Sequence, residues 1–202
     1  MQDPAQTLPD ERPWLIVIAA SAGGVSALRT LLAGLPASTR AAVVIIQHRS
    51  PTYASMLDSI LARSAKMRVT TARQGETIQS GVVYLSRPDL HLTIVPDGRF
   101  AYVDGTRVRG LYSSANPLFE SAAREFGDRT IAIVLTGSGI DATDGVQTVK
   151  ARGGIVIAQD PQSAEFSSMP RSAVKSGAVD RVLPLEAIAP ALVAITQGQP
   201  IT

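Results

Sequence analysis

The hydrophobic positions of this chain form two kinds of pattern, continuous runs and helically spaced positions. Residues 15–20 are an unbroken apolar run, and 41–47 are apolar up to a final glutamine. A strand buried on both faces of a sheet shows such a run because neither of its faces is polar. Similar runs at 131–135 and 155–158 predict two more buried strands, and helically spaced apolar residues follow three of these four runs. The pattern predicts an α/β fold, with a mostly parallel sheet covered by helices on both faces.

The middle of the chain departs from this alternation. Short apolar segments at 81–85, 92–95 and 100–103 predict short strands, and Pro96-Asp97-Gly98-Arg99 joins the last two. Aspartate followed by glycine favours a tight turn between paired strands, so we expect an antiparallel β-hairpin here. Helical spacing returns at 117–126.

Length and composition indicate a single domain. The 202 residues are 45% hydrophobic, which is enough to bury a core of their own. We expect residues 1–13 to form a disordered N-terminal tail, because they are polar and include three prolines, and residues 14–202 to form the domain. The tail lacks the basic opening and apolar run of a signal peptide, and no apolar run approaches the roughly 20 residues that cross a bilayer. We therefore expect a cytoplasmic protein that is not embedded in a membrane.

Composition also excludes several kinds of site. The chain has no cysteine, which excludes disulfides, thiolate metal sites and a cysteine nucleophile. Its net charge is +2 and aromatic residues make up 4%, so neither a basic phosphate-binding surface nor an aromatic platform for bases is indicated. We expect no nucleic-acid partner, no metal and no organic cofactor.

Three of the predicted strands end at reactive side chains. Ser21 and His48 each follow a buried run, and Asp141 lies in the loop after the run at 131–135. The carboxyl ends of parallel strands share one edge of a sheet, and ligands bind beyond that edge in open α/β folds. We therefore predict that these three side chains meet at one site.

Ser21 lies in Ala19-Ala20-Ser21-Ala22-Gly23, which has the small-x-Ser-x-Gly form of a nucleophile elbow. A helix that begins just after the serine supplies free N–H groups and the positive end of its dipole, which stabilise an oxyanion. Ala22 and Gly23 are therefore predicted to contribute to oxyanion and substrate binding. The alternative is that Ser21 only caps the helix, since serine is a favoured N-cap residue. A dinucleotide loop is disfavoured because G-x-G-x-x-G is absent.

A serine nucleophile needs a base, and the chain has two histidines, His48 and His91. His48 directly follows a buried strand and is the better candidate, while His91 is the reserve. A carboxylate must also orient the imidazole. The loop after 131–135 offers Asp141 and Asp144, and we assign this role to Asp141 and helix capping to Asp144.

The same loop supplies the second group of predicted substrate contacts. Glycines at 137 and 139 permit unusual dihedral angles and close backbone approach. The loop can therefore bring the carboxylate and backbone amides to one place. We predict that Ser138 and Gly139 line the oxyanion and substrate loop.

Seven ordered motifs run from about Leu15 to Ile195: Ala20-Ser21-Ala22-Gly23-Gly24, Gln47-His48, Tyr84-Leu85, His91-Leu92, Pro117-Leu118-Phe119-Glu120-Ser121-Ala122, Leu135-Thr136-Gly137-x-Gly139-x-Asp141 and Phe166-x-x-Met169-Pro170-Arg171-Ser172-Ala173. Together they resemble the catalytic domain of CheB-type protein-glutamate methylesterases. The resemblance implies a doubly wound sheet with an antiparallel hairpin, and a triad of Ser21 as nucleophile, His48 as base and Asp141 as orienting carboxylate. It also implies hydrolysis of glutamyl methyl esters on the cytoplasmic helices of methylated chemoreceptors, through an acyl-enzyme on Ser21, and in some members deamidation of receptor glutamine.

The chain departs from the family pattern beside the predicted triad. Ser138 replaces a usual methionine, Ala142 a usual glycine, and Ser113-Ser114-Ala115-Asn116 stands where Pro-Ser-x-Asp is common. Family members typically carry an N-terminal phosphorylatable receiver domain, for which the 13 residues before Trp14 are too few. For a complete chain we therefore expect control to come from elsewhere, whereas an excised domain would have lost its receiver domain. The substituted loops leave a second hypothesis open, a non-catalytic signalling or docking module. The complete triad favours the enzyme.

Overall fold

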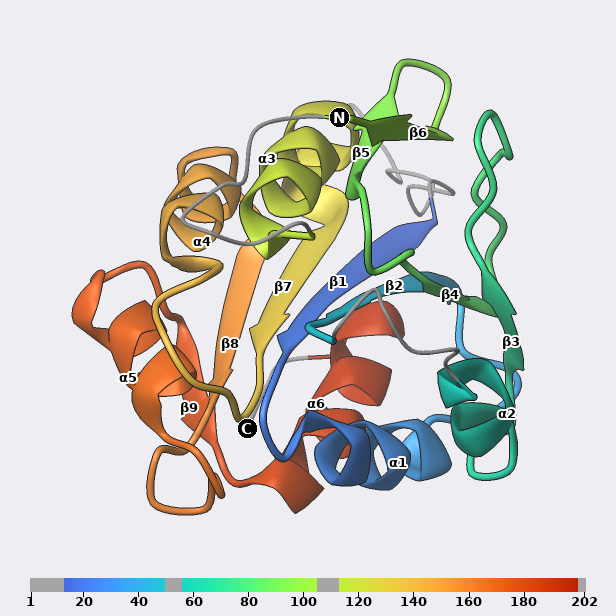
Figure 1. The fold of residues 1–202 in the computed structure, drawn as a ribbon. Coiled ribbons are helices and arrows are strands. Elements are labelled where there is room, and N and C mark those ends of the chain that lie inside the picture. The colour runs from blue at the N-terminus through green and yellow to red at the C-terminus, as the bar shows by residue number, and fades with distance from the viewer. Residues whose placement is uncertain (1–12, 50–55, 105–112, 200–202) are drawn as a thin grey trace, which may run out of the picture.

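The computed structural model describes residues 13–49, 56–104 and 113–199 (Figure 1). The tail expected at 1–13 therefore lies, apart from Pro13, outside the described residues. In chain order the elements are β1 (Trp14–Ala20), α1 (Gly24–Gly34), β2 (Ala41–Gln47), α2 (Leu57–Ala62), β3 (Arg68–Thr71), β4 (Val82–Leu85), β5 (His91–Val95), β6 (Arg99–Val103), α3 (Ala115–Phe126), the 3₁₀ helix Gly127–Arg129, β7 (Thr130–Val134), α4 (Thr143–Ala151), β8 (Ile155–Gln159), α5 (Ser168–Lys175), β9 (Arg181–Leu183) and α6 (Leu185–Thr196).

Within these residues, seven strands form one sheet in the order β3-β4-β2-β1-β7-β8-β9, and every pairing in it is parallel. From the central strand β1 the chain first builds the sheet on the β2 side and later returns to the other side at β7. The topological switch point therefore lies between β1 and β7. In open α/β sheets the crevice beyond the carboxyl ends of the strands at such a point is the usual ligand site.

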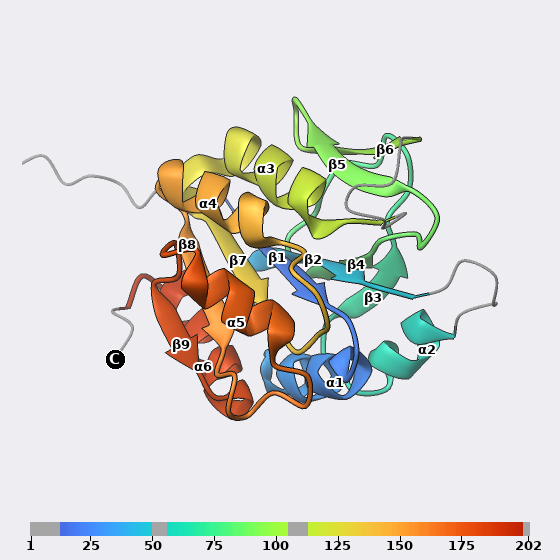
Figure 2. The same ribbon diagram turned by 60° about the vertical axis from the view of Figure 1, so that its left-hand side comes forward.

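Helices cover both faces of this sheet (Figures 1 and 2). Successive residues of β1 face opposite sides, because side chains alternate along a strand: Val17 packs in one apolar cluster and Ile18 in the other. The first cluster includes residues of α3, α4, α5 and the β5–β6 hairpin, and the second includes residues of α1, α2 and α6. The predicted α/β architecture, a parallel sheet between helical layers, is confirmed.

The predicted hairpin is also confirmed. β5 and β6 pair antiparallel, from His91 opposite Val103 to Val95 opposite Arg99. Asp97 and Gly98 both have positive φ, of 70° and 63°, as the tight turns that match the twist of paired strands require. Five elements of the described residues, β3, the 3₁₀ helix Gly127–Arg129, α5, β9 and α6, were not predicted.

The described helices are short. The longest of them, α3 and α6, have 12 residues each. No helix in the described ranges is long and apolar enough to cross a membrane.

Candidate active site

Ser21 lies in the short turn between β1 and α1. Its N–H donates to the C=O of Thr136 over 3.1 Å, and its C=O accepts the N–H of Gly24 over 2.8 Å. The N-cap of α1 is Gly23, with φ 73° and no side-chain cap bond, so the alternative in which Ser21 caps the helix is wrong. Within the described ranges the Ser21 hydroxyl makes no hydrogen bond, and the residue is partly exposed. The hydroxyl is therefore available for reaction.

The loop between β7 and α4 passes directly beside Ser21. A Cβ atom added to Gly137 would lie 2.9 Å from the Cβ of Ser21 and 2.4 Å from the Sδ of Met169. Both separations are too short for ordinary contacts, so only glycine fits here. This glycine allows the close backbone approach that the sequence predicted, and it brings the loop from β7 next to the turn after β1.

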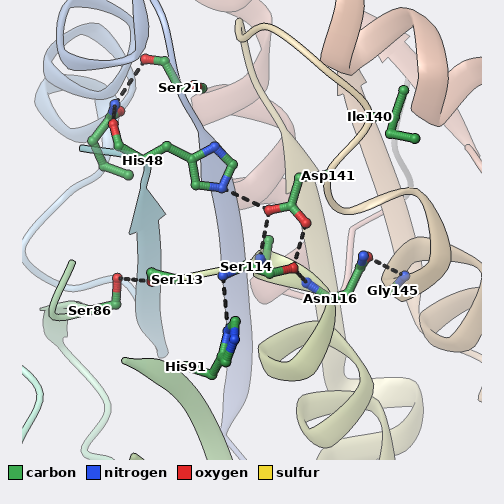
Figure 3. Close-up of polar contacts among 12 residues, drawn as sticks. Ser21, His48, Ser86, His91, Ser113, Ser114, Asn116, Ile140, Asp141 and Gly145 are labelled. Atoms are coloured by element: carbon green, nitrogen blue, oxygen red, sulfur yellow. Dashed lines mark hydrogen bonds and ion pairs between the residues drawn. The ribbon is translucent and has the colours of Figure 1, made fainter. Parts of the chain in front are cut away.

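His48 and Asp141 meet at the same edge of the sheet (Figure 3). The N–H of His48 donates to the C=O of Ala20 over 3.0 Å, which aligns the end of β2 with the end of β1. The Nε2 of His48 lies 2.8 Å from Oδ2 of Asp141. Asp141 also accepts the Ser114 hydroxyl on Oδ1 at 2.6 Å and the N–H of Ala115 on Oδ2 at 2.7 Å.

These contacts set the protonation of the pair. Burial of Asp141 favours its neutral form, but hydrogen bonds from His48, Ser114 and the Ala115 N–H outweigh burial and hold the pKa of Asp141 below its ordinary value. An ionised carboxylate only accepts hydrogen bonds, so Nε2 of the His48 ring is the donor. In the neutral imidazole the free base is then Nδ1. No hydrogen bond joins this ring to the Ser21 hydroxyl among the described residues.

His91 occupies a different position. It is 5% exposed, and its Nδ1 accepts the N–H of Ser114 over 3.2 Å. Its Nε2 is buried without a partner in the described part of the chain. The geometry therefore gives His91 a role in holding the segment before α3, and gives no support to its use as the reserve base.

Sequence reasoning missed Ser114 and Ala115, the two further donors to Asp141. Ser114 is the N-cap of α3, where its hydroxyl oxygen accepts the N–H of Asn116 over 3.2 Å while the hydroxyl proton goes to Asp141. A serine just before an amphipathic helix is a recognisable cap signal. Nothing local indicates that this cap faces a carboxylate 27 residues away.

Asp144 does not cap α4, and that prediction was wrong. The helix begins at Thr143, two residues earlier than an Asp144 cap requires, and its N-cap is Ala142 with no side-chain cap bond. Ala142 is buried and has φ 70°, a left-handed conformation in which glycine is at ease and alanine is strained. Asp144 instead lies in the first turn, near the positive end of the helix dipole.

Two of the predicted oxyanion groups follow Ser21 in the chain, and the other two follow Gly137, which lies next to Ser21. Across the described residues, the N–H groups of Ala22, Gly23, Ser138 and Gly139 donate to no protein acceptor. Ala22 and Gly23 follow Ser21 directly, and the other two belong to the loop that Gly137 brings alongside. No three His, Asp or Glu side chains in the described ranges are grouped as metal ligands.

We expect the two loop aspartates to differ sharply on mutation. Asp141→Asn should lower turnover by about 10⁴, as the same change does in a serine protease, because an amide no longer fixes the tautomer and charge of the base. Asp144→Ala should cost about 0.3–1 kcal/mol of stability through the lost charge at the helix N-terminus, with the rate unchanged. Turnover and thermal melts measured in parallel check both, and a rate collapse confined to the Asp144 variant would reverse the assignment.

The lowered pKa of Asp141 also predicts a pH dependence of stability. A carboxylate whose pKa is lower in the folded than in the unfolded state stabilises the fold above its ordinary pKa, and that contribution is lost as the pH falls through the lowered value. The wild type should therefore exceed Asp141→Asn in unfolding free energy most at neutral pH, with a gap that narrows below about pH 4. Urea unfolding of both proteins at pH 7, 5 and 3 measures this gap. A gap that stays constant to pH 3 would contradict the ionised, hydrogen-bonded carboxylate.

The chain as a whole is similar to one family of known proteins. The family described as CheB methylesterase matches residues 16–192. A Leptospira interrogans protein, provisionally named protein-glutamate methylesterase/protein-glutamine glutaminase, is 37% identical over 183 residues, which are 91% of this chain and 95% of that protein. A Rhizobium meliloti protein of the same name, from the group 3 operon, is 37% identical over 92% of this chain but 52% of its own length. The catalytic domain of CheB methylesterase from Thermotoga maritima superposes with a TM-score of 0.88 at 30% identity, covering 91% of this chain and 99% of that domain.

Proposed function

This chain belongs to the CheB methylesterase family, and on that premise we propose that it is a serine hydrolase that removes methyl esters from receptor glutamates, with Ser21 as its nucleophile. The observation that supports this most directly is the His48–Asp141 pair at 2.8 Å, located at the sheet's switch point beside a partly exposed serine hydroxyl. A base held by a buried carboxylate next to a free hydroxyl is the arrangement that acyl transfer requires.

The first half of the proposed reaction forms an acyl-enzyme. Nδ1 of His48 takes the Ser21 proton while Oγ forms a bond to the ester carbonyl carbon, and the carbonyl electron pair moves onto its oxygen. The free N–H groups near Ala22 and Ser138 hold this oxyanion. The intermediate then collapses, the bond to the methoxy oxygen breaks, and the imidazolium returns its proton to give methanol. Asp141 stabilises the imidazolium throughout.

The second half releases the product. A water molecule gives a proton to His48 and attacks the acyl carbon, and the bond to Ser21 Oγ breaks as the serine regains a proton. The product is a glutamate side chain. Formation of the same acyl-enzyme from a glutamine side chain breaks the carbon–nitrogen bond and releases ammonia in place of methanol, which accounts for deamidation as a second activity.

The proposed substrate is the cytoplasmic helical region of a chemotaxis receptor, which places the enzyme in the cytoplasm. Two large apolar side chains near the site support docking of a protein segment: Ile140, which precedes Asp141, is 49% exposed, and Phe166 is 41% exposed. The C=O of Phe166 accepts the N–H of Gly137, beside Ser21. A glutamyl side chain that reaches Ser21 brings its own backbone close to this rim.

Incubation with receptor membranes that carry radioactive methyl groups tests the proposal. We expect release of radioactive methanol, and covalent labelling of Ser21 by a serine-directed phosphonate. A folded protein that binds receptor but releases no methanol and takes up no phosphonate would instead support the non-catalytic docking module.

A further inference from the structure

The side chain of Gln47, the last residue of β2, lies between the two residues proposed to exchange a proton. Its Nε2 donates to the C=O of Ser21 over 2.9 Å and to the C=O of His48 over 3.0 Å. The residue is 8% exposed. One buried amide group therefore joins the backbones of two residues that follow different strands.

This arrangement leaves one buried oxygen atom of Gln47 without a hydrogen-bond donor in the described part of the chain. The two bonds use both protons of the amide, and within the described ranges Oε1 of Gln47 is buried without a donor. That oxygen faces the start of α1, where a Cβ atom on Gly24 would lie only 2.2 Å from it. A buried acceptor without a partner destabilises a fold. A position that served only to fill the core would favour an apolar side chain of the same shape.

The two hydrogen bonds of the Gln47 side chain contribute little to the stability of the fold. The C=O of Ser21 also accepts the N–H of Gly24, so it stays bonded without Gln47. Loss of the amide frees only the C=O of His48, and it also removes the unpartnered Oε1. The contribution of this amide to stability is therefore small.

We propose that Gln47 is a positioning residue, which sets the approach of the Ser21 hydroxyl to Nδ1 of His48. The inference rests on the proposed function, because it assumes proton transfer within that pair. No hydrogen bond joins the hydroxyl to the ring among the described contacts, so their approach depends on how the two backbones are held. A misplacement of about 1 Å between reacting groups costs on the order of 10² in rate.

The chain offers a matched control in Gln159, the last residue of β8. This glutamine is 1% exposed, its Oε1 accepts the N–H of Thr136 over 2.9 Å, and its Nε2 lies 3.3 Å from the C=O of Ser163. It touches neither Ser21 nor His48. Replacing it leaves a buried backbone N–H without an acceptor, so its loss should affect stability more than chemistry.

The test compares Gln47→Met with Gln159→Met, since methionine keeps the shape and removes the amide. For each variant, three quantities are measured: the melting temperature, kcat and KM for p-nitrophenyl acetate, and the rate at which a serine-directed phosphonate labels Ser21. We expect Gln47→Met to lower kcat and the labelling rate by about 10- to 100-fold, with KM within about twofold and a melting temperature within about 3 °C of wild type. Gln159→Met should melt several degrees lower and keep the wild-type labelling rate.

Two results for the variants would overturn the inference: wild-type labelling of Gln47→Met, or rate losses that follow the melting temperature in both variants. The labelling measurement needs no receptor, so it separates this inference from the proposed substrate. Wild-type protein that takes up phosphonate but leaves receptor methyl esters intact would contradict only the proposed substrate. The comparison of Gln47→Met with Gln159→Met would still decide the role of Gln47. Wild-type protein that takes up no phosphonate would overturn both.

Discussion

Ser21→Ala is expected to abolish ester hydrolysis without changing the fold. The loss in kcat should be on the order of 10⁶, the size seen when the nucleophile of another serine hydrolase is removed, because binding and oxyanion contacts cannot replace the covalent step. Stability should stay close to wild type, since the hydroxyl makes no hydrogen bond within the described ranges and its removal leaves no buried group unpaired. Hydrolysis of receptor methyl esters and thermal melting, measured on the same preparation, check the two halves of this prediction.

A matched control for this variant is Ser176→Ala. Ser176 is the C-cap of α5, and its hydroxyl donates to the C=O of Ala173 over 2.6 Å. Its removal should cost about 1 kcal/mol of stability and leave hydrolysis unchanged, the reverse of what we expect at Ser21. Wild-type hydrolysis by Ser21→Ala would remove Ser21 from the mechanism.

His48→Ala should be nearly as damaging as the loss of the nucleophile, because a serine hydroxyl without a base is a poor nucleophile. Residues that act as one catalytic unit are not additive, so the double variant Ser21→Ala/His48→Ala should lose little beyond either single variant. Steady-state rates for the three proteins measure this. Losses that multiply in the double variant would mean that the two side chains act independently.

His91→Ala is expected to affect stability rather than rate, in contrast to His48→Ala. His91→Ala removes the acceptor of the buried Ser114 N–H and should cost about 1–3 kcal/mol of stability. The loss in rate per folded molecule should be far smaller than for His48→Ala, because His91 bonds to the segment that supports Asp141 and not to the proposed nucleophile. If the two histidines exchanged these behaviours, the base would have to be reassigned to His91.

The central strands were predictable because they are buried on both faces. β1 and β2 are almost entirely apolar, and burial is what makes an apolar run informative. The edge strands carry no such signal: β3 reads Arg-Val-Thr-Thr and is partly exposed, and β9 has three residues. Their positions depend on pairing with β4 and β8, which is a tertiary property.

Two helices escaped prediction for different reasons. In α6 apolar residues lie on nearly every side, and Pro190 stands inside the helix, so the amphipathic stripe is obscured. In α5 the helix follows a loop rich in polar residues and is only eight residues long. Both helices pack on the sheet, and that packing overrides their weak local signals.

The positions of the candidate triad followed from topology, since Ser21 and His48 come directly after predicted parallel strands and Asp141 lies in the loop after a third. The donors that surround Asp141 could not be found in this way. Ser114 is the N-cap of α3, Ala115 is its first residue, and Gln47 acts through its side chain on two backbone carbonyls. Each of these contacts joins segments that are far apart in sequence. The capping role expected of Asp144 was wrong because α4 begins before this residue, at Thr143, directly after the left-handed Ala142.

The acyl-enzyme itself offers the most direct test of the account. A short peptide that carries a glutamyl methyl ester is mixed with the protein, the reaction is quenched in acid, and the digested protein is analysed by mass spectrometry. We expect an adduct on the fragment that contains Ser21, with a mass equal to that of the peptide less methanol, and no adduct in Ser21→Ala. Methanol release at the wild-type rate from Ser21→Ala, or an adduct on any other residue, would contradict the account.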